Sequence, residues 1–184
     1  VKAKEAETGR PIGIYPELKH PTMLLEQAGI DVVDLFAAAL KTAGLDKADS
    51  KAFVQVFEIA PLKRLNRLID TPLVLLIAPA GGPYDEKGLS WRDVMTPSGL
   101  TEVATYADGI GPSMGYVVDA QGQPTSLVAD AHAAGLKVHP WTLRKENAFL
   151  PPALQNPGGP GARGKLAEAL AQLSAAGIDG LFTD

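Results

Sequence analysis

The sequence predicts an α/β fold in which short parallel strands alternate with helices. About six strand-like segments, beginning near residues 12, 52, 73, 108, 136 and 179, are separated by helical or loop segments. The longest apolar run, residues 73–78, has the length and composition of a strand buried on both faces. Hydrophobic residues make up 46% of the 184 residues, which is enough for a substantial core. We therefore expect one parallel sheet covered by helices.

The first strand-like segment alternates between apolar and chemically functional residues. Ile14 and Leu18 fall on one face. Tyr15, Glu17 and Lys19 fall on the other face. The segment thus predicts a strand that places a carboxylate and an ammonium group side by side.

The helices that come after each strand are indicated by apolar spacing and by capping residues. Asp31 predicts the start of the first helix and Gly44 its end. The predicted helices cover residues 32–43, 61–69, 99–106, 126–134 and 165–176. Residues 79–97 are rich in Gly and Pro and predict a long loop excursion.

The choice between an open doubly wound sheet and a barrel depends on the motif after the first strand. Neither G-x-G-x-x-G nor G-x-x-x-x-G-K-[ST] occurs, which removes the main reason to expect a nucleotide-binding open sheet. The sequence therefore favours a TIM-type (β/α)8 barrel. Since about six units are two fewer than a closed barrel needs, we expect residues 1–184 to be one partial barrel domain that lacks its first strands.

Composition excludes several classes of function. The net charge is −4, and no run of like charges or basic and aromatic stripe indicates a nucleic-acid partner. No apolar run approaches the length of a bilayer span, so no stable membrane insertion is expected. The absence of cysteine excludes disulfides and thiolate metal sites. No oligomeric state is predicted.

Candidate site residues lie where predicted strands end, because the carboxyl ends of barrel strands meet at one mouth. The candidates are Glu17, Lys19, Gln55, Glu58, His139, Trp141, Thr142, Thr183 and Asp184. Glu17 could hold a hard cation while Lys19 faces an anionic oxygen, but the two could equally form an ordinary surface ion pair. His139 could be packed or catalytic. No histidine spacing typical of a transition-metal site occurs.

Five segments resemble the glycerophosphodiester phosphodiesterase family, particularly its periplasmic bacterial branch. The first, residues 13–21, contains Gly13, Tyr15, Glu17 and Lys19 in the spacing of the family's G-x-Y-x-E-[IL]-K motif. The others occur in order at residues 54–65, 106–112, 138–144 and 177–184.

The resemblance implies a barrel enzyme that hydrolyses glycerophosphodiesters to glycerol 3-phosphate and an alcohol with a divalent cation, Ca²⁺ or Mg²⁺. It implies that Glu17 binds the metal and that Lys19 neutralises phosphate charge. It also implies that Gln55 and Trp141 line the substrate mouth. The small-molecule substrate would be the partner, and the compartment would be periplasmic or extracellular.

The family's two catalytic histidines and its Glu-x-Asp metal pair belong to the first two strands and occur nowhere in this sequence. The resemblance therefore implies that the chain corresponds to strands three to eight, contains no catalytic residue, and is inactive alone. Two alternatives remain open at this point. One is a barrel that binds glycerophosphodiesters without hydrolysis, and the other is an aldolase-type barrel in which Lys19 forms a Schiff base.

Overall fold

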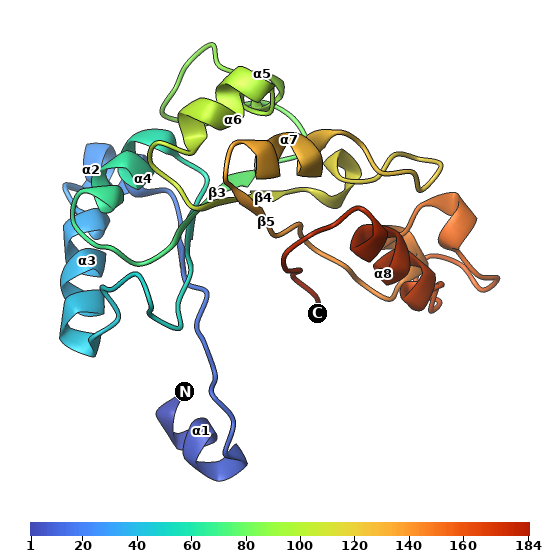
Figure 1. The fold of residues 1–184 in the computed structure, drawn as a ribbon, viewed down its shortest axis with the longest axis horizontal. Helices are drawn as coiled ribbons and strands as arrows, with labels where there is room; N and C mark the ends of the chain where they lie inside the picture. Colours follow the sequence, from blue (N-terminus) through green and yellow to red (C-terminus); the bar gives the residue numbers. More distant parts are fainter.

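The centre of the molecule is a five-stranded parallel sheet, seen in a computed structural model that describes residues 1–184 (Figure 1). The strands are β1 (Glu17–Leu18), β2 (Val54–Val56), β3 (Leu73–Ile77), β4 (Gly109–Pro112) and β5 (Lys137–Val138). They lie in the sheet in the order in which they occur in the chain. A doubly wound sheet reverses its strand order at a switch point, whereas this sheet winds in one direction, as a barrel wall does.

The last predicted strand, residues 179–184, lies beside β5 and its continuation but forms only an isolated bridge. Leu143 and Thr183 make that bridge in parallel orientation. The Leu143 N–H donates to the Phe182 carbonyl at 2.8 Å, and the Phe182 N–H donates to the Pro140 carbonyl at 3.0 Å. Residues 179–184 thus extend the sheet beyond β5 as a sixth segment. The hydrogen-bonded strands are shorter than the alternation of residues predicts.

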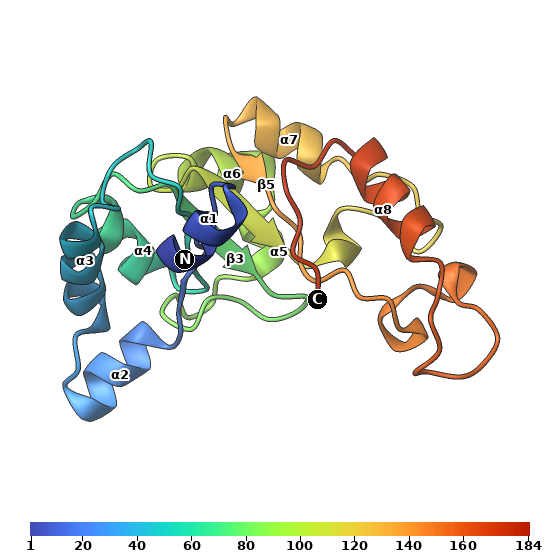
Figure 2. The ribbon, with the colours of Figure 1, turned by 90° about the horizontal axis from the view of Figure 1, so that it is seen from below.

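The helices surround the strands, except that α1 stands apart from them (Figure 1). They are α1 (Lys2–Thr8), α2 (Pro21–Ala28), α3 (Val32–Ala43), α4 (Ile59–Asn66), α5 (Trp91–Val94), α6 (Pro97–Val103), α7 (Leu127–Ala133) and α8 (Leu166–Ala175), with short 3-10 turns at η1 (Met114–Tyr116), η2 (Asn147–Phe149) and η3 (Pro152–Leu154). Seen from below, α3, α4, α6, α7 and α8 succeed one another in an arc around the strands (Figure 2). No helix has the length and apolar character needed to cross a membrane.

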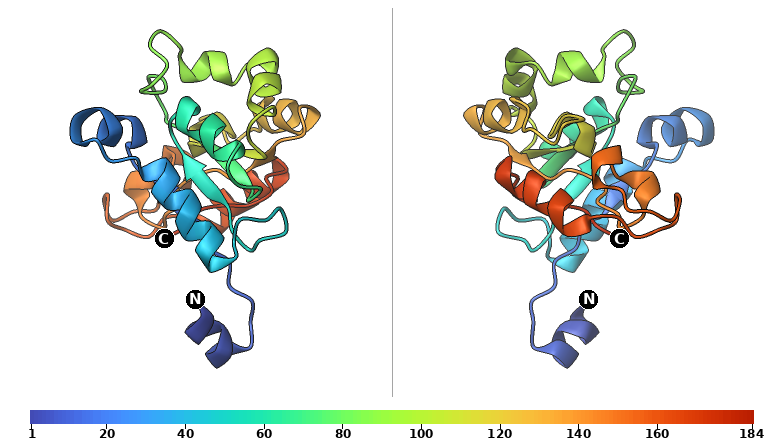
Figure 3. Two further views of the ribbon diagram at one scale, coloured as in Figure 1. Left: turned by 90° about the vertical axis from the view of Figure 1, so that its left-hand side faces the viewer. Right: turned by 90° about the vertical axis from the view of Figure 1, so that its right-hand side faces the viewer.

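The predicted helix after the first strand is confirmed at both ends. The Asp31 carboxylate accepts a hydrogen bond from the Asp34 N–H at 3.2 Å, and Gly44 ends the helix with a left-handed φ of 67°. Helices α1 and α2 were not predicted. Helix α1 has a polar sequence without an apolar stripe. It therefore buries no residue, and it stands apart from the sheet on an extended segment (Figure 3).

The three central strands of the sheet are buried on both faces. Every residue of β2, β3 and β4 is buried. Alternate residues of these strands, among them Val54, Leu75 and Ile110, belong to a core cluster of 31 buried apolar residues. Trp91 belongs to this core although it lies in the predicted loop excursion, where it begins α5 and is 2% exposed. The excursion is therefore anchored to the barrel by a short helix, which a count of Gly and Pro does not reveal.

Candidate active site

The carboxyl ends of β1 and β2 and the segments that come after β5 enclose a cavity of about 280 Å³. It is lined by Glu17, Lys19, Gln55, Phe57, Leu76, Trp141, Thr142 and Phe182. All four residues to which the sequence gives a binding role are among them, although they are separated by as much as 124 positions in the chain (141 − 17). The parallel ladder brings them together because Glu17 pairs with Gln55 in register.

Glu17 and Lys19 form an ion pair at the rim of this cavity. The Lys19 Nζ lies 2.8 Å from the Glu17 Oε2. The Glu17 side chain is 20% exposed and the Lys19 side chain is 70% exposed. Water screens such a pair, which therefore contributes about 0–1 kcal/mol to stability. The arrangement leaves the ammonium group open to an anionic ligand.

Gln55 and Trp141 form more rigid walls of the cavity. Gln55 is 8% exposed, and its Nε2 lies 3.5 Å from the Tyr15 carbonyl oxygen that accepts from it. The Trp141 Nε1 donates to the Gly111 carbonyl at 2.8 Å, which fixes the indole against β4. The Phe57 ring meets the Trp141 ring edge to face at 5.9 Å. One wall of the cavity is thus aromatic and apolar.

A second cavity of about 400 Å³ adjoins the first and shares Glu17, Lys19 and Phe57 with it. Its wall also contains His20, Glu58, Tyr84 and Trp91. His20 takes a left-handed backbone conformation, with φ 53°, at the turn into α2. Non-glycine residues adopt this conformation uncommonly, and such positions are frequent near binding sites.

His139 lies in the barrel interior and lines neither cavity. It is 7% exposed, and its Nδ1 shares a hydrogen bond of 2.9 Å with the Tyr15 hydroxyl. The Phe53 ring packs edge to face on it at 5.1 Å. Burial lowers the pKa of His139, which favours the neutral ring. Gly180 allows this packing, because a Cβ there would lie 2.8 Å from the His139 Cδ2. Of the two interpretations left open by the sequence, the structure shows the packed histidine.

The final strand end places Thr183 and Asp184 away from the cavity. Asp184 pairs with Arg144, and Thr183 takes part in the bridge to Leu143. Phe182, two residues before the chain ends, lines the cavity instead. Alternation puts Gly180, Phe182 and Asp184 on one face of this segment, so it indicated Phe182 as readily as Asp184.

The chain by itself does not form a metal centre. No group of three or more His, Asp or Glu side chains gathers anywhere in it. Glu17 offers the carboxylate oxygens that Ca²⁺ and Mg²⁺ prefer, but these ions take six or more ligands. The donor is of the right kind, but one carboxylate is too few to hold such an ion.

A comparison with known families decides which one the chain represents. The sequence model of the glycerophosphoryl diester phosphodiesterase family matches residues 1–184. The chain belongs to this family. The family assignment made from the five motif segments is thereby confirmed.

Curated relatives in the glycerophosphodiester phosphodiesterase family are about twice as long as this chain. A glycerophosphodiester phosphodiesterase of Arabidopsis thaliana is 31% identical over 95% of this chain and 49% of its own length. One of Haemophilus influenzae is 30% identical over all of this chain and 53% of its own length. The chain thus spans about half of each relative.

Solved structures show the same fold. A structure from Silicibacter pomeroyi that carries the family's name superposes with a TM-score of 0.63 at 21% identity, over 97% of this chain and 49% of the other. A structure from Agrobacterium tumefaciens with the same family name superposes with a TM-score of 0.53 at 17% identity, over 92% of this chain and 52% of the other. Together with the singly wound parallel sheet, these matches confirm the predicted TIM-type α/β fold.

Proposed function

We propose that the intact protein containing this chain hydrolyses glycerophosphodiesters to glycerol 3-phosphate and an alcohol with a divalent cation. The observation that carries the proposal is the single cavity in which Lys19, Glu17, Gln55 and Trp141 converge, in a chain of the phosphodiesterase family. It contains a cation for the phosphate, a carboxylate for a metal ion, and an apolar wall for carbon atoms.

Each side chain has a distinct part in this proposal. The exposed Lys19 ammonium would bind a phosphate oxygen and stabilise the charge that develops there during hydrolysis. The buried Gln55 amide would orient a hydroxyl or phosphate oxygen. Phe57 and Trp141 would exclude water beside the substrate. A bound Ca²⁺ or Mg²⁺ would polarise the phosphoryl group, with Glu17 as one of its ligands.

The general acid and base of this reaction would come from outside residues 1–184. The family's His-Arg-Gly, His-Asp and Glu-x-Asp contexts occur nowhere in the chain, and the curated relatives extend over about twice its length. We propose that these groups lie on two further strands between β1 and the 179–184 segment. Residues 1–184 would then bind substrate poorly and not turn it over.

The aldolase alternative is disfavoured by the surroundings of Lys19. A lysine that forms a Schiff base is deprotonated in a desolvated or cationic site. Lys19 is 70% exposed and lies 2.8 Å from a carboxylate, so its site is neither desolvated nor cationic. Borohydride trapping with a carbonyl substrate should therefore give no adduct at Lys19.

The decisive experiment substitutes Glu17→Gln in the intact protein and measures glycerophosphocholine hydrolysis against Ca²⁺ and Mg²⁺ concentration. We expect weaker cation binding and a rate lower by about 100-fold or more, because one charged ligand is lost from the metal. Glu102→Gln is the matched control, because Glu102 lies on α6 and lines neither mouth cavity.

Unchanged cation dependence in Glu17→Gln would contradict the metal role of Glu17. Substrate binding without hydrolysis by the unaltered intact protein would support the non-catalytic alternative instead. Isothermal titration with glycerophosphocholine separates these two results, because it reports binding whether or not turnover occurs.

A further inference from the structure

Glu58 is a buried carboxylate that the substrate and metal roles above do not use. It lies just after β2, is 3% exposed, and has no cationic partner within the chain. An ionised carboxylate this deeply buried is costly unless hydrogen bonds stabilise it. Its position therefore needs a physical reason.

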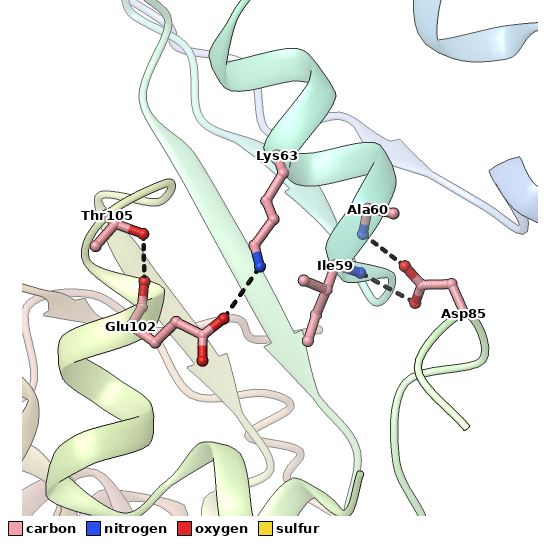
Figure 4. A network of polar contacts seen from close by, with 6 residues as sticks. All are labelled: Ile59, Ala60, Lys63, Asp85, Glu102 and Thr105. Carbon is pink, nitrogen blue, oxygen red and sulfur yellow. Dashed lines mark hydrogen bonds and ion pairs between the residues drawn. The ribbon is translucent and has the colours of Figure 1, made fainter. Parts of the chain in front are cut away.

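The position of Glu58 suggests a helix cap, but the cap is made by another residue. Glu58 is the N-cap residue of α4, and its side chain makes no cap hydrogen bond. Instead the Asp85 carboxylate, from the excursion after β3, accepts from the Ile59 N–H at 3.1 Å and the Ala60 N–H at 2.5 Å (Figure 4). Because Asp85 satisfies these donors, the Glu58 carboxylate is free to bind elsewhere.

The Glu58 carboxylate binds the turn that carries the candidate active-site pair. Its Oε2 accepts from the Thr22 N–H at 2.9 Å, at the first turn of α2. Thr22 is three residues after Lys19, beyond the left-handed His20. Glu58, Lys19 and His20 line the same cavity. One hydrogen bond thus connects the segment after β2 to the turn that comes directly after Glu17 and Lys19.

We propose that Glu58 is a positioning residue that holds the β1–α2 turn and thereby fixes Glu17 and Lys19 at the mouth. The proposal rests on the phosphodiesterase function proposed above. A turn with a left-handed non-glycine residue stores strain and persists only where its surroundings hold it. The Thr22 N–H is one of the helix-start donors without an intrahelical partner, and a charged acceptor is favourable there.

The test compares Glu58→Leu with Glu58→Gln in the intact protein. Glutamine keeps an acceptor of the same shape without the charge, whereas leucine removes the acceptor. If Glu58 acts by position, Glu58→Leu should lower kcat/KM for glycerophosphocholine and cation affinity by about 10- to 100-fold. Glu58→Gln should stay within about threefold of the unaltered protein, because a neutral hydrogen bond replaces the charged one.

Hydrogen exchange gives a second readout that does not depend on turnover. Glu58→Leu should raise exchange in the peptide covering residues 17–24 by about tenfold or more, while the β3 peptide covering residues 73–77 keeps its protection. Glu58→Gln should leave the exchange of both peptides unchanged. The matched control Glu102→Leu, which removes an exposed carboxylate, should leave both peptides and the activity unchanged.

Three results would overturn the positioning role. One is equal loss of activity in Glu58→Gln and Glu58→Leu, which would show that the charge acts directly. Another is unchanged exchange at residues 17–24 in Glu58→Leu. The third is lost protection in β3, which would show a general effect on folding. An inactive unaltered protein would instead overturn the phosphodiesterase proposal, and exchange at residues 17–24 would still decide the positioning role.

Discussion

Two lysine–glutamate pairs of nearly the same length lie in different regions of the molecule. Lys19 and Glu17 meet at 2.8 Å at the mouth of the strands, and Lys63 and Glu102 meet at 3.0 Å between α4 and α6 (Figure 4). At the mouth the carboxylate is recessed, at 20% exposure, and the ammonium is open, at 70%. In the outer layer the exposures are reversed, at 66% for Glu102 and 37% for Lys63.

The difference lies in what else each lysine contacts. The Lys63 Nζ lies 4.8 Å from the centre of the Tyr106 ring, so an aromatic face and a carboxylate share its charge. Lys19 has Glu17 as its charged partner and lines both mouth cavities. The distance within each pair therefore does not separate the two, whereas the cavities beside Lys19 do.

The largest expected effect separates the two lysines by activity. In the intact protein, Lys19→Met should lower kcat/KM for glycerophosphocholine by about 100- to 1,000-fold, because a charge facing the phosphate is lost. Lys63→Met should change it by less than about twofold, since Lys63 lies in the outer layer. Chemical denaturation should show less than about 1 kcal/mol of destabilisation from the loss of either pair. Equal activity of the two variants would remove the distinction between the pairs.

A medium effect concerns the cap of α4 in the outer layer. Asp85→Ala removes the acceptor of two backbone N–H groups and should lower the free energy of unfolding by about 0.5–2 kcal/mol. Asp85→Asn keeps an acceptor oxygen, so its free energy of unfolding should fall by less than that of Asp85→Ala. Urea unfolding of both variants tests this order, and a larger loss in Asp85→Asn would contradict the capping role.

The smallest expected effect is a pH dependence that arises in the barrel interior, below the mouth. Burial lowers the pKa of His139 from an ordinary value of 6.5, so the unfolded chain binds its proton more readily than the folded chain. The stabilising contribution of neutral His139 is complete above about pH 6.5 and is lost as pH falls through the lower folded pKa. Asp179 and Lys137 act on this pKa in opposite directions.

Thermal unfolding between pH 7.5 and pH 5.5 measures this contribution. As the pH falls, the melting temperature of His139→Gln should decline less steeply than that of the unaltered chain, whatever the absolute stability of the variant. The control is His20→Asn, which replaces an exposed histidine by a residue that tolerates its left-handed conformation. A flatter decline in the control alone would contradict the assignment to His139.

Local sequence patterns predicted much of the outer structure of this protein. The cap at Asp31 and the stop at Gly44 defined α3, because both depend on hydrogen bonds and torsion angles within a few residues. Helix α2 was not predicted, since Pro21 and Thr22 resemble a loop when the turn before them is unknown. The sequence located β1 and β5 correctly but predicted them to be longer than they are. A strand ends where its neighbour no longer pairs with it in register, and the alternating pattern does not show where that happens.

For the site, the sequence by itself determined which side chains stand at strand ends, and the family motif selected Glu17, Lys19, Gln55 and Trp141 among them. Their convergence on one cavity arises from parallel strands wound in a single direction, a property of the sheet. The position of Glu58 was decided only by tertiary structure. Glu58 occupies the N-cap position of α4, but Asp85, 27 positions later (85 − 58), makes the cap hydrogen bonds, and the Glu58 carboxylate binds the turn at Thr22. Competition between distant acceptors for the same donors cannot be read from a local pattern.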